Sequence, residues 1–326
     1  MQIEADKNNG STRIGLGLAA IGRPEYINLR QEKDLDKSEI NYEARALKLL
    51  DFAYTMGIRD FDTAPSYGRG EAFLMKWYRQ HGSADLKLST KWGYTYVADW
   101  QIGYEGAHEI KEHSLAKLSE QWATSKQLLP GLKIYQIHSA TFDSGILDNT
   151  EVLQGLNELK KKFNLKIGMS VSGHNQLEIL EVARIVKIDG LDLFDSFQVS
   201  YNILETSTHH IVRSLIEDGK IVIIKEAMAN GRLFKNDSFS HYAPLYDHLE
   251  KLSKKHKTTV DALALRFVID NLNPTVVLSG AATENQLASN LMANSIGLDQ
   301  NELNYLSGFA ANRDDYWKER SNLVWN

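Results

Sequence analysis

The sequence predicts an α/β protein in which eight parallel strands close into a (β/α)8 TIM barrel. Its 326 residues are 43% apolar and 24% charged, a composition that can supply a large buried core. Short apolar runs alternate with helical patterns and recur roughly 25 to 50 residues apart, which is typical of parallel strands joined by right-handed crossovers. No linker interrupts this alternation, so we expect residues 1–326 to form a single barrel domain.

The first barrel strand is expected at residues 14–18, with an N-terminal β-hairpin before it. Two short extended runs around an Asn-Asn-Gly turn at residues 8–10 indicate that hairpin. Residues 15–20 also match the dinucleotide fingerprint G-x-G-x-x-A, but Gly-Arg-Pro follows where the fingerprint requires a helix. We therefore interpret Gly15 and Gly17 as points of close approach to other backbone or to a ligand.

Seven more strands are expected after the first, separated by helices. Short apolar runs bounded by turn residues predict the strands at residues 58–62, 86–91, 132–138, 166–170, 193–198, 221–225 and 275–279. Apolar residues three and four positions apart predict helices at residues 44–54, 71–80, 106–126, 153–163, 177–186, 209–216, 242–272 and 284–293. A loop rich in aromatic residues, 92–104, follows the third strand.

Composition and charge narrow the classes of function. A net charge of -5 and a pI near 6.1 give no basic surface for nucleic acid. The absence of cysteine excludes disulfides, a thiol nucleophile and a cysteine-based zinc site. No long apolar run or secretory signal is present, so we expect a cytoplasmic protein without a membrane span. The histidines lack facing carboxylates at ligand spacing, which predicts no metal, and the oligomeric state stays open.

Titratable residues stand at the carboxyl ends of three successive predicted strands. Asp62 ends the second strand, and Lys91 and His138 end the next two. Tyr67 lies in the turn just after Asp62. In a closed barrel these strand ends face one mouth, where catalytic groups collect. We therefore expect Asp62, Tyr67, Lys91 and His138 to converge there.

These four residue types suit the protonation of a developing alkoxide. A tyrosine has an unperturbed pKa near 10, and a neighbouring ammonium would lower it. We interpret Lys91 as that charge, Asp62 as the carboxylate that pairs with Lys91, and His138 as the donor that orients a carbonyl oxygen near Tyr67. Since no side chain can supply a hydride, this set needs a nicotinamide cofactor.

Five motifs make the chain resemble the aldo-keto reductase family: G-x-R-x-F-D-T-A-x-x-Y-G at 57–68, S-T-K at 89–91, I-H at 137–138, I-G-M-S at 167–170 and S-G-A-x-T-x-x-Q-x-x-x-N at 279–290. The resemblance runs from about residue 12 to the end of the chain. It implies a barrel closed at the bottom by the hairpin, and reduction of aldehydes or ketones with NADPH or sometimes NADH. It also implies Tyr67 as the acid/base, with Asp62, Lys91 and His138 as its partners.

The resemblance further implies a cofactor site. It places Ser170 and Gln198 on the nicotinamide carboxamide, and it places five residues at the adenosine phosphate end: Ser279, Gly280, Ala281, Gln286 and Asn290. Independently of the resemblance, a helix that starts after residue 283 offers backbone N–H groups to a phosphate. Arg232 could reach the pyrophosphate.

Three positions depart from the family pattern. Val171 stands where many members have Asn, and Lys225 stands where many have an aromatic residue that stacks on the nicotinamide. Gln286 stands where some members have an Arg that binds the 2'-phosphate. We therefore count Lys225 among the cofactor contacts and expect NADP(H) over NAD(H), although that preference is weakened because a guanidinium is the strongest phosphate clamp.

The expected ligand is a small-molecule carbonyl or alcohol substrate. Trp92 and Tyr94, in the aromatic loop after Lys91, are its candidate contacts. The leading hypothesis is an NAD(P)H-dependent reductase of a small aldehyde, ketone or sugar. One alternative stays open, a non-catalytic NADP(H)-binding sensor on the same fold. A metal-dependent hydrolase that uses Asp62 and His138 would require more His or acidic ligands at the strand ends than the sequence provides.

Overall fold

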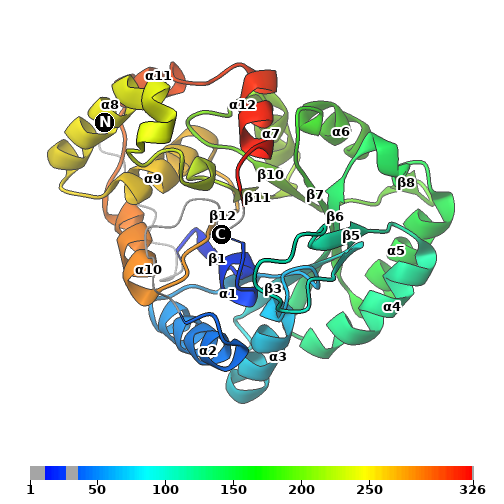
Figure 1. Cartoon of the computed structure of the whole chain (residues 1–326). Coiled ribbons are helices and arrows are strands. Elements are labelled where there is room, and N and C mark those ends of the chain that lie inside the picture. The colour runs from blue at the N-terminus through cyan, green and yellow to red at the C-terminus, as the bar shows by residue number, and fades with distance from the viewer. Residues whose placement is uncertain (1–11, 27–35, 325–326) are drawn as a thin grey trace.

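Eight parallel strands form a closed barrel around the centre of the protein (Figure 1). The computed structural model describes residues 12–26 and 36–324, so the expected N-terminal hairpin lies outside the described residues. The barrel order is β1-β12-β11-β10-β7-β6-β3-β2. In chain order the strands are β1 (Ile14–Gly17), β2 (Asp60–Asp62), β3 (Lys87–Trp92), β6 (Leu132–Ala140), β7 (Lys166–Val171), β10 (Ser196–Ser200), β11 (Ile221–Lys225) and β12 (Val276–Ser279). The predicted (β/α)8 barrel is confirmed.

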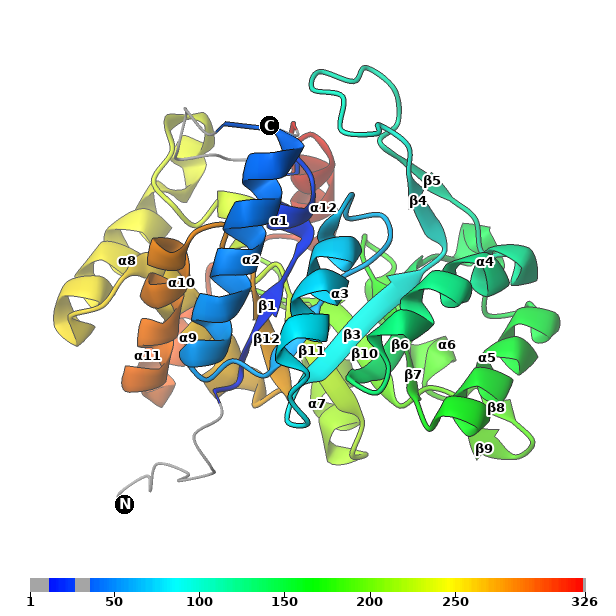
Figure 2. The ribbon, with the colours of Figure 1, turned by 90° about the horizontal axis from the view of Figure 1, so that it is seen from below.

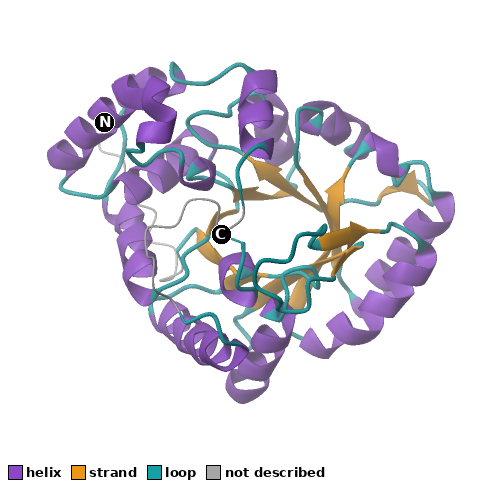
Figure 3. Ribbon diagram, viewed as in Figure 1, coloured by secondary structure: helices purple, strands orange, loops and turns teal. Residues whose placement is uncertain are grey.

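Helices surround the barrel on its outside (Figure 3). Those between or after the barrel strands are α2 (Glu39–Thr55), α3 (Gly70–His81), α4 (Leu115–Ser125), α5 (Thr150–Phe163), α6 (Gln176–Ala183), α7 (His209–Glu217), α8 (Ala243–His256), α9 (Val260–Leu272) and α10 (Glu284–Leu291). Shorter helices are α1 (Ala19–Gly22), α11 (Gln300–Ser307) and α12 (Arg313–Ser321). Each long helix buries one apolar face; α7, for example, buries Ile211, Val212 and Leu215.

Close packing at the first strand explains one glycine. A Cβ on Gly15 would lie 2.9 Å from the backbone oxygen of Asp60 on β2 and 2.8 Å from a methyl group of Val276 on β12. Both contacts are shorter than a side-chain carbon tolerates. The predicted close approach of backbone at Gly15 is therefore confirmed, and the strands on both sides of β1 depend on it.

The expected helix at 106–126 is wrong over residues 106–114. β5 (Glu109–Lys111) pairs antiparallel with β4 (Tyr94–Tyr96), and α4 begins only at Leu115. The Ser114 side chain accepts a hydrogen bond from the Lys117 backbone N–H, which caps the helix there. The aromatic loop therefore forms a β-hairpin that rises above one end of the barrel (Figure 2).

The expected helical region at 242–272 is two helices, because a left-handed residue separates α8 from α9. Lys257 has a φ of 50°, and Thr259 then caps α9 by accepting from the backbone N–H of Ala262. Both helices bury apolar residues against the same barrel, so the helical spacing of apolar residues in the sequence continues across the break and does not reveal it. No helix of the described residues has the length and apolar character to cross a membrane.

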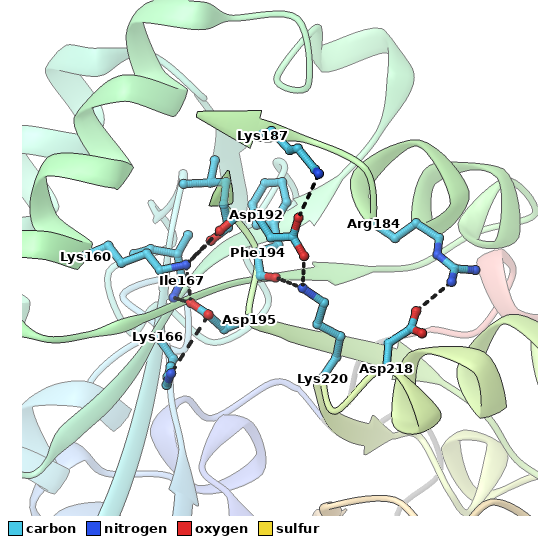
Figure 4. Close-up of polar contacts among 11 residues, drawn as sticks. Lys160, Lys166, Ile167, Arg184, Lys187, Asp192, Phe194, Asp195, Asp218 and Lys220 are labelled. Carbon is cyan, nitrogen blue, oxygen red and sulfur yellow. Dashed lines mark hydrogen bonds and ion pairs between the residues drawn. The ribbon is translucent and has the colours of Figure 1, made fainter. Parts of the chain in front are cut away.

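A cluster of ion pairs lies at the end of the barrel opposite the β4–β5 hairpin (Figure 4). The short hairpin of β8 (Lys187–Ile188) and β9 (Leu191–Asp192) is held there by Lys220, whose ammonium is 2.8 Å from Asp192. Lys160 pairs with Asp195 at 2.8 Å. These charges are partly exposed, so each pair contributes only about 0.2–1 kcal/mol to stability.

Candidate active site

Asp62 lies at the centre of a buried hydrogen-bond network at the carboxyl ends of the strands. Its Oδ1 accepts hydrogen bonds from Ser89 Oγ at 2.7 Å, Gln198 Nε2 at 3.0 Å and Gln136 Nε2 at 3.3 Å. Its Oδ2 forms an ion pair with the Lys91 ammonium. Asp62 and Lys91 are almost entirely buried. The carboxylate is therefore held as a fixed counter-ion to Lys91.

Strand alternation brings these donors together. Ser89 precedes Lys91 by two residues on β3, and Gln136 precedes His138 by two residues on β6. Residues two apart in a strand point to the same face, here the interior of the barrel. Sequence reasoning missed Ser89 and Gln136 as partners of Asp62, although their period-two spacing from the chosen Lys and His was a usable signal.

Tyr67 lies against the other three residues of the predicted set. The Lys91 ammonium is 4.8 Å from the centre of the Tyr67 ring, and the His138 ring meets the Tyr67 ring edge-on at 5.5 Å between centres. Gly68, with a φ of 62°, turns the chain directly after Tyr67 into α3. The structure thus brings Asp62, Tyr67, Lys91 and His138 together at one mouth.

The pKa of Tyr67 is raised well above its ordinary value, mainly by burial and next by the negative charge of Asp62. This corrects the expectation that a neighbouring ammonium lowers it. Lys91 is close enough, but its charge is balanced by Asp62, so the phenol experiences little net positive field. Tyr67 is consequently a neutral phenol at neutral pH, the form that can donate a proton.

His138 is a neutral imidazole. Burial and then the charges of Lys91 and Lys225 hold its pKa well below the usual value. Its Nδ1 lies 3.2 Å from the hydroxyl oxygen of Ser66, a residue of the same turn as Tyr67 that sequence reasoning missed. In the tautomer in which Ser66 donates to Nδ1, Nε2 carries the ring proton and can donate it to a ligand.

The two residues expected at the nicotinamide carboxamide are neighbours in the barrel. Ser170 on β7 and Gln198 on β10 are register partners, and both are buried. The Ser170 Oγ accepts from the backbone N–H of Ser139 at 2.9 Å. Gln198 directs its amide N–H to Asp62. Gln198 thus belongs to the network of Asp62, while Ser170 retains its own hydroxyl proton for a ligand.

Lys225 ends β11 and binds to hydroxyl groups. Its ammonium donates to Ser172 Oγ at 2.7 Å and to Ser200 Oγ at 2.9 Å. Burial lowers its pKa to about 8. The next residue, Glu226, has a φ of 58° and accepts from Arg320 of α12 at 2.8 Å. An ammonium therefore stands at the strand end where the family pattern has an aromatic ring.

Two of the residues expected at the adenosine phosphate end belong to an internal network. The Ser279 hydroxyl donates to Asn290 Oδ1 at 2.6 Å, and Asn290 Nδ2 donates to Asp261 at 2.6 Å. Ser279 Oγ also accepts from the backbone N–H of Ala281 at 3.1 Å. Ser279 and Asn290 are buried, and their hydrogen bonds hold the loop after β12 in place.

The amino terminus of α10 is open to a ligand at Gly280. Gly280 is exposed, and among the described residues no atom beyond its chain neighbours lies within 4 Å of where its Cβ would be. Beside it, the Gln286 side chain accepts from the backbone N–H of Ala282 at 2.8 Å. Glu284, in the first turn, pairs with Lys48 at 2.6 Å. The space at Gly280 and the helix terminus fit a cofactor phosphate.

Arg232 is placed away from open space. Its side chain is completely buried, pairs with Glu319 at 2.7 Å and stacks on the Tyr316 ring at 4.2 Å. Both partners belong to α12. The guanidinium therefore fastens α12 to the loop after β11.

The two aromatic candidates for substrate contact differ in accessibility. Trp92 is fully buried and packs against His113, with ring centres 5.5 Å apart. Tyr94 is partly exposed, and its ring centre is 4.9 Å from that of His138. Only Tyr94 thus presents surface beside the predicted catalytic set, because β4 carries it over the mouth.

The chain is similar to known proteins over most of its length. The chain is 22% identical over 320 residues to the "NADH-specific methylglyoxal reductase" of Escherichia coli, covering 88% of this chain and 91% of that protein. It is 24% identical to "Aldo-keto reductase YhdN" of Bacillus subtilis over 316 residues, covering 87% of this chain and 85% of that protein.

Solved structures show the same fold. The glycerol dehydrogenase AKR11B4 from Gluconobacter oxydans has a TM-score of 0.66 at 19% identity, covering 95% of this chain and 94% of that one. The aldo-keto reductase AKR11C1 from Bacillus halodurans also has a TM-score of 0.66, at 21% identity, covering 92% of both chains. The sequence pattern of the Aldo/keto reductase family matches residues 13–311, and the chain belongs to that family.

Proposed function

We propose that the protein reduces the carbonyl group of a small aldehyde, ketone or sugar, with Tyr67 as the proton donor. The observation that carries this proposal is the convergence of a neutral buried phenol, a neutral imidazole and a buried Lys91–Asp62 ion pair at one mouth. Membership of the family supports oxidoreductase chemistry on a small carbonyl substrate. A donor, an orienting group and a charge pair are the parts such a reduction requires.

Each residue of the set has a separate role in the proposed reaction. His138 and Tyr67 would both donate hydrogen bonds to the carbonyl oxygen, which polarises the carbonyl and places it. A reduced nicotinamide, when bound, supplies a hydride to the carbonyl carbon. As negative charge develops on the oxygen, Tyr67 transfers its phenolic proton there and leaves an alcohol. Lys91 stabilises the resulting phenolate until a proton from solvent restores Tyr67, and Asp62 keeps Lys91 in position.

We further propose that Ser170 and the terminus of α10 at Gly280 and Ala281 contact the cofactor, without a preference for NADPH. The expected preference for NADP(H) is not supported by the relatives, one of which is named NADH-specific. The Gln286 amide is bound to Ala282, and a carboxylate, Glu284, stands in the first turn of α10. Gln286 supplies no positive charge for a 2'-phosphate where an Arg would, and the nearby Lys48 ammonium is already paired with Glu284.

Replacement of Tyr67 tests the proposed function. Tyr67→Phe removes the hydroxyl and retains the ring, so we expect at least a hundredfold loss of kcat, since general acid catalysis contributes about 10²–10⁴-fold. Cofactor oxidation is followed by absorbance with a panel of aldehydes. The matched control is Tyr135→Phe, because the Tyr135 ring packs against Trp122 at 5.1 Å on the outside of the barrel.

The result distinguishes an enzyme from a sensor. Turnover that survives undiminished in Tyr67→Phe, with the control also active, would exclude Tyr67 as the donor. A parent protein that binds NADH or NADPH but reduces no carbonyl compound would instead favour the cofactor-binding sensor.

A further inference from the structure

Lys225 is half-buried as a residue, and the groups that accept hydrogen bonds from its ammonium are neutral. Among the described residues, only the hydroxyl groups of Ser172 and Ser200 accept its hydrogen bonds, and none of their carboxylates lies within 4.0 Å of it. An ammonium has three donors, so these two bonds leave one for a ligand. A cation in a largely buried position is costly unless an anion approaches it.

The adjacent carboxylate, Glu226, acts on Lys225 through its charge but forms its hydrogen bonds with other groups. Glu226 follows Lys225 in sequence, but its left-handed backbone turns its side chain toward α12. One carboxylate oxygen accepts from Arg320 at 2.8 Å, and the other accepts from Ser200 Oγ at 3.1 Å. Ser200 thus links Lys225 to Glu226 without bringing the two charges into contact.

The barrel register places Lys225 beside the catalytic set. Gln198, whose amide donates to Asp62, lies two residues before Ser200 on β10. Ser200 is the register partner of Lys225 on the neighbouring strand β11. Strands are about 4.8 Å apart and each residue advances about 3.3 Å along a strand. Lys225 is therefore close enough to the hydrogen-bond network of Asp62 for one small molecule to contact both. The positive charge of Lys225 also contributes to the low pKa of His138.

A second ammonium of the same kind lies on the β4–β5 hairpin. Lys111 donates to Thr141 Oγ1 at 2.7 Å and lies 5.6 Å from the centre of the Tyr94 ring, which itself packs against His138. It too has no carboxylate within 4.0 Å among the described residues. Positive charge without a carboxylate partner therefore borders the mouth from two different elements.

We infer that Lys225, with the hydroxyl group of Ser172, binds a carboxylate of the substrate, so that the preferred substrates are aldehydes or ketones that carry an acid group. The Ser172 hydroxyl accepts from Lys225 and retains its own proton, so it can donate to the same carboxylate. The carbonyl of such an oxo acid would then lie between Tyr67 and His138. This assignment rests on the proposed reductase function.

A phosphate of the cofactor is the other anion to consider. The open position for a phosphate is Gly280, which follows β12 at the amino terminus of α10. Lys225 lies on the preceding strand of the barrel, where its charge acts on the reacting end of the site. The geometry therefore favours the substrate carboxylate.

The preference for acids has an expected pH dependence. The pKa of Lys225 is lowered to about 8, chiefly by burial, so the ammonium is present below that pH and is lost above it. Glu226, with its pKa lowered to about 2, and Arg320 keep their charges throughout that range. The charged groups and hydroxyls that face Lys225 are Glu226, Arg320, Lys91, Asp62, Ser172 and Ser200. Preference for acids should therefore fall as pH rises through about 8.

The test compares a carboxylate with its neutral amide on one scaffold. We would measure kcat/KM for 4-carboxybenzaldehyde and 4-formylbenzamide, and for succinic semialdehyde and its amide, in the parent protein and in Lys225→Met. A charge-assisted hydrogen bond in a buried site corresponds to roughly tenfold to hundredfold discrimination. We expect the parent to prefer the acids by that factor. Lys225→Met should lose the preference, so that the ratio of kcat/KM for each acid to that for its amide falls to about one.

Two further variants keep the test independent of folding. Lys225→Arg retains the cation and should keep part of the preference, and Ser172→Ala should reduce it severalfold. The Kd of NADH is measured by fluorescence for each variant. An equal loss on acids and amides together with weaker NADH binding would overturn the inference and assign Lys225 to the cofactor. A parent protein that shows no preference for acids would overturn it as well.

A binding measurement separates failure of this inference from failure of the proposed function. Calorimetric titration of 4-(hydroxymethyl)benzoate into the NAD⁺-loaded protein needs no turnover. If no aldehyde is reduced, but this acid binds the parent at least tenfold more tightly than it binds Lys225→Met, the carboxylate site stands and the reductase proposal fails. Equal binding to both proteins would overturn the carboxylate site.

Discussion

At the scale of single residues, Asp62 determines the electrostatics of the site. It forms an ion pair with Lys91 and accepts three further hydrogen bonds from Ser89, Gln136 and Gln198. This arrangement cancels the charge of Lys91 before it can act strongly on the phenol. The proton donor is therefore neutral at rest, and Lys91 becomes important only when the phenol ionises.

Removing Lys91 should affect stability and activity together. Lys91→Met leaves a buried carboxylate without its cation, which we expect to cost about 3–5 kcal/mol in free energy of unfolding. We also expect turnover to fall at least a hundredfold, because the phenolate loses its stabilising charge. Urea denaturation and the aldehyde assay measure the two effects.

The double variant Lys91→Met with Asp62→Asn separates the two effects of Lys91. It removes both charges, so it should recover most of the lost stability and none of the lost turnover. A double variant as unstable as Lys91→Met alone would contradict the view that an unpaired Asp62 causes the destabilisation.

At the scale of elements, α12 and the loop after β11 act as one unit beside the site. Two ion pairs join them: Glu226 to Arg320 at 2.8 Å and Arg232 to Glu319 at 2.7 Å. Each pair has one member on α12 and one in the segment that follows β11. The backbone around Lys225 is thus held by a helix roughly 90 residues further along the chain, which gives its ammonium a fixed place.

The start of α10 should determine the choice of cofactor. Gln286→Arg combined with Glu284→Gln supplies a guanidinium and removes a negative charge at the helix terminus. We expect kcat/KM for NADPH to rise roughly tenfold to hundredfold, since an Arg–phosphate pair is a strong, charge-assisted contact. The value for NADH should change less than threefold, because NADH has no 2'-phosphate.

The matched control for the cofactor prediction is Gln286→Lys with the same Glu284 change. A lysine provides a point charge without the bidentate geometry, so it should give a smaller rise for NADPH. Equal gains for NADH and NADPH would contradict a role of this turn in recognising the 2'-phosphate.

At the scale of the whole molecule, barrel closure makes the interior dry enough to keep histidines neutral. His113 donates from Nε2 to the backbone oxygen of His138, and burial lowers the pKa of His113 to about 4. Burial likewise keeps the pKa of His138 well below its usual value. Both rings gain a proton when the chain unfolds in mild acid, so the free energy of unfolding decreases under those conditions.

Stability should therefore fall as the pH decreases below about 6.5. The folded pKa of His113 is depressed, so the unfolded chain binds more protons between about pH 6.5 and pH 4, and its share of the loss amounts to about 3 kcal/mol at pH 4. Urea denaturation at pH 7.5, 6, 5 and 4.5 measures the trend. His113→Gln should flatten part of it, because glutamine does not titrate in this range. An unchanged pH profile in that variant would exclude His113 as a source.

The sequence by itself determined the barrel and the residues at its mouth. Apolar runs alternating with helical patterns predicted all eight strands. The positions of Asp62, Lys91 and His138 at successive strand ends predicted their convergence, because strands joined by helical crossovers run parallel and end at the same mouth. The sequence prediction was wrong where the short strand β5 interrupts the helix expected at 106–126. The region expected to be helical at 242–272 is helical, but a left-handed residue, Lys257, divides it into two helices.

Only the tertiary structure decided how the charges are shared. The burial and the counter-charge that raise the pKa of Tyr67, the buried pairing of Arg232 with α12, and the hydroxyl partners of Lys225 all depend on residues far apart in sequence. A side chain's electrostatic state depends on what surrounds it in space and on how much water reaches it, and neither quantity is contained in a local sequence pattern. The burial that results from barrel closure thus also determines the protonation states of Tyr67 and His138 at its mouth.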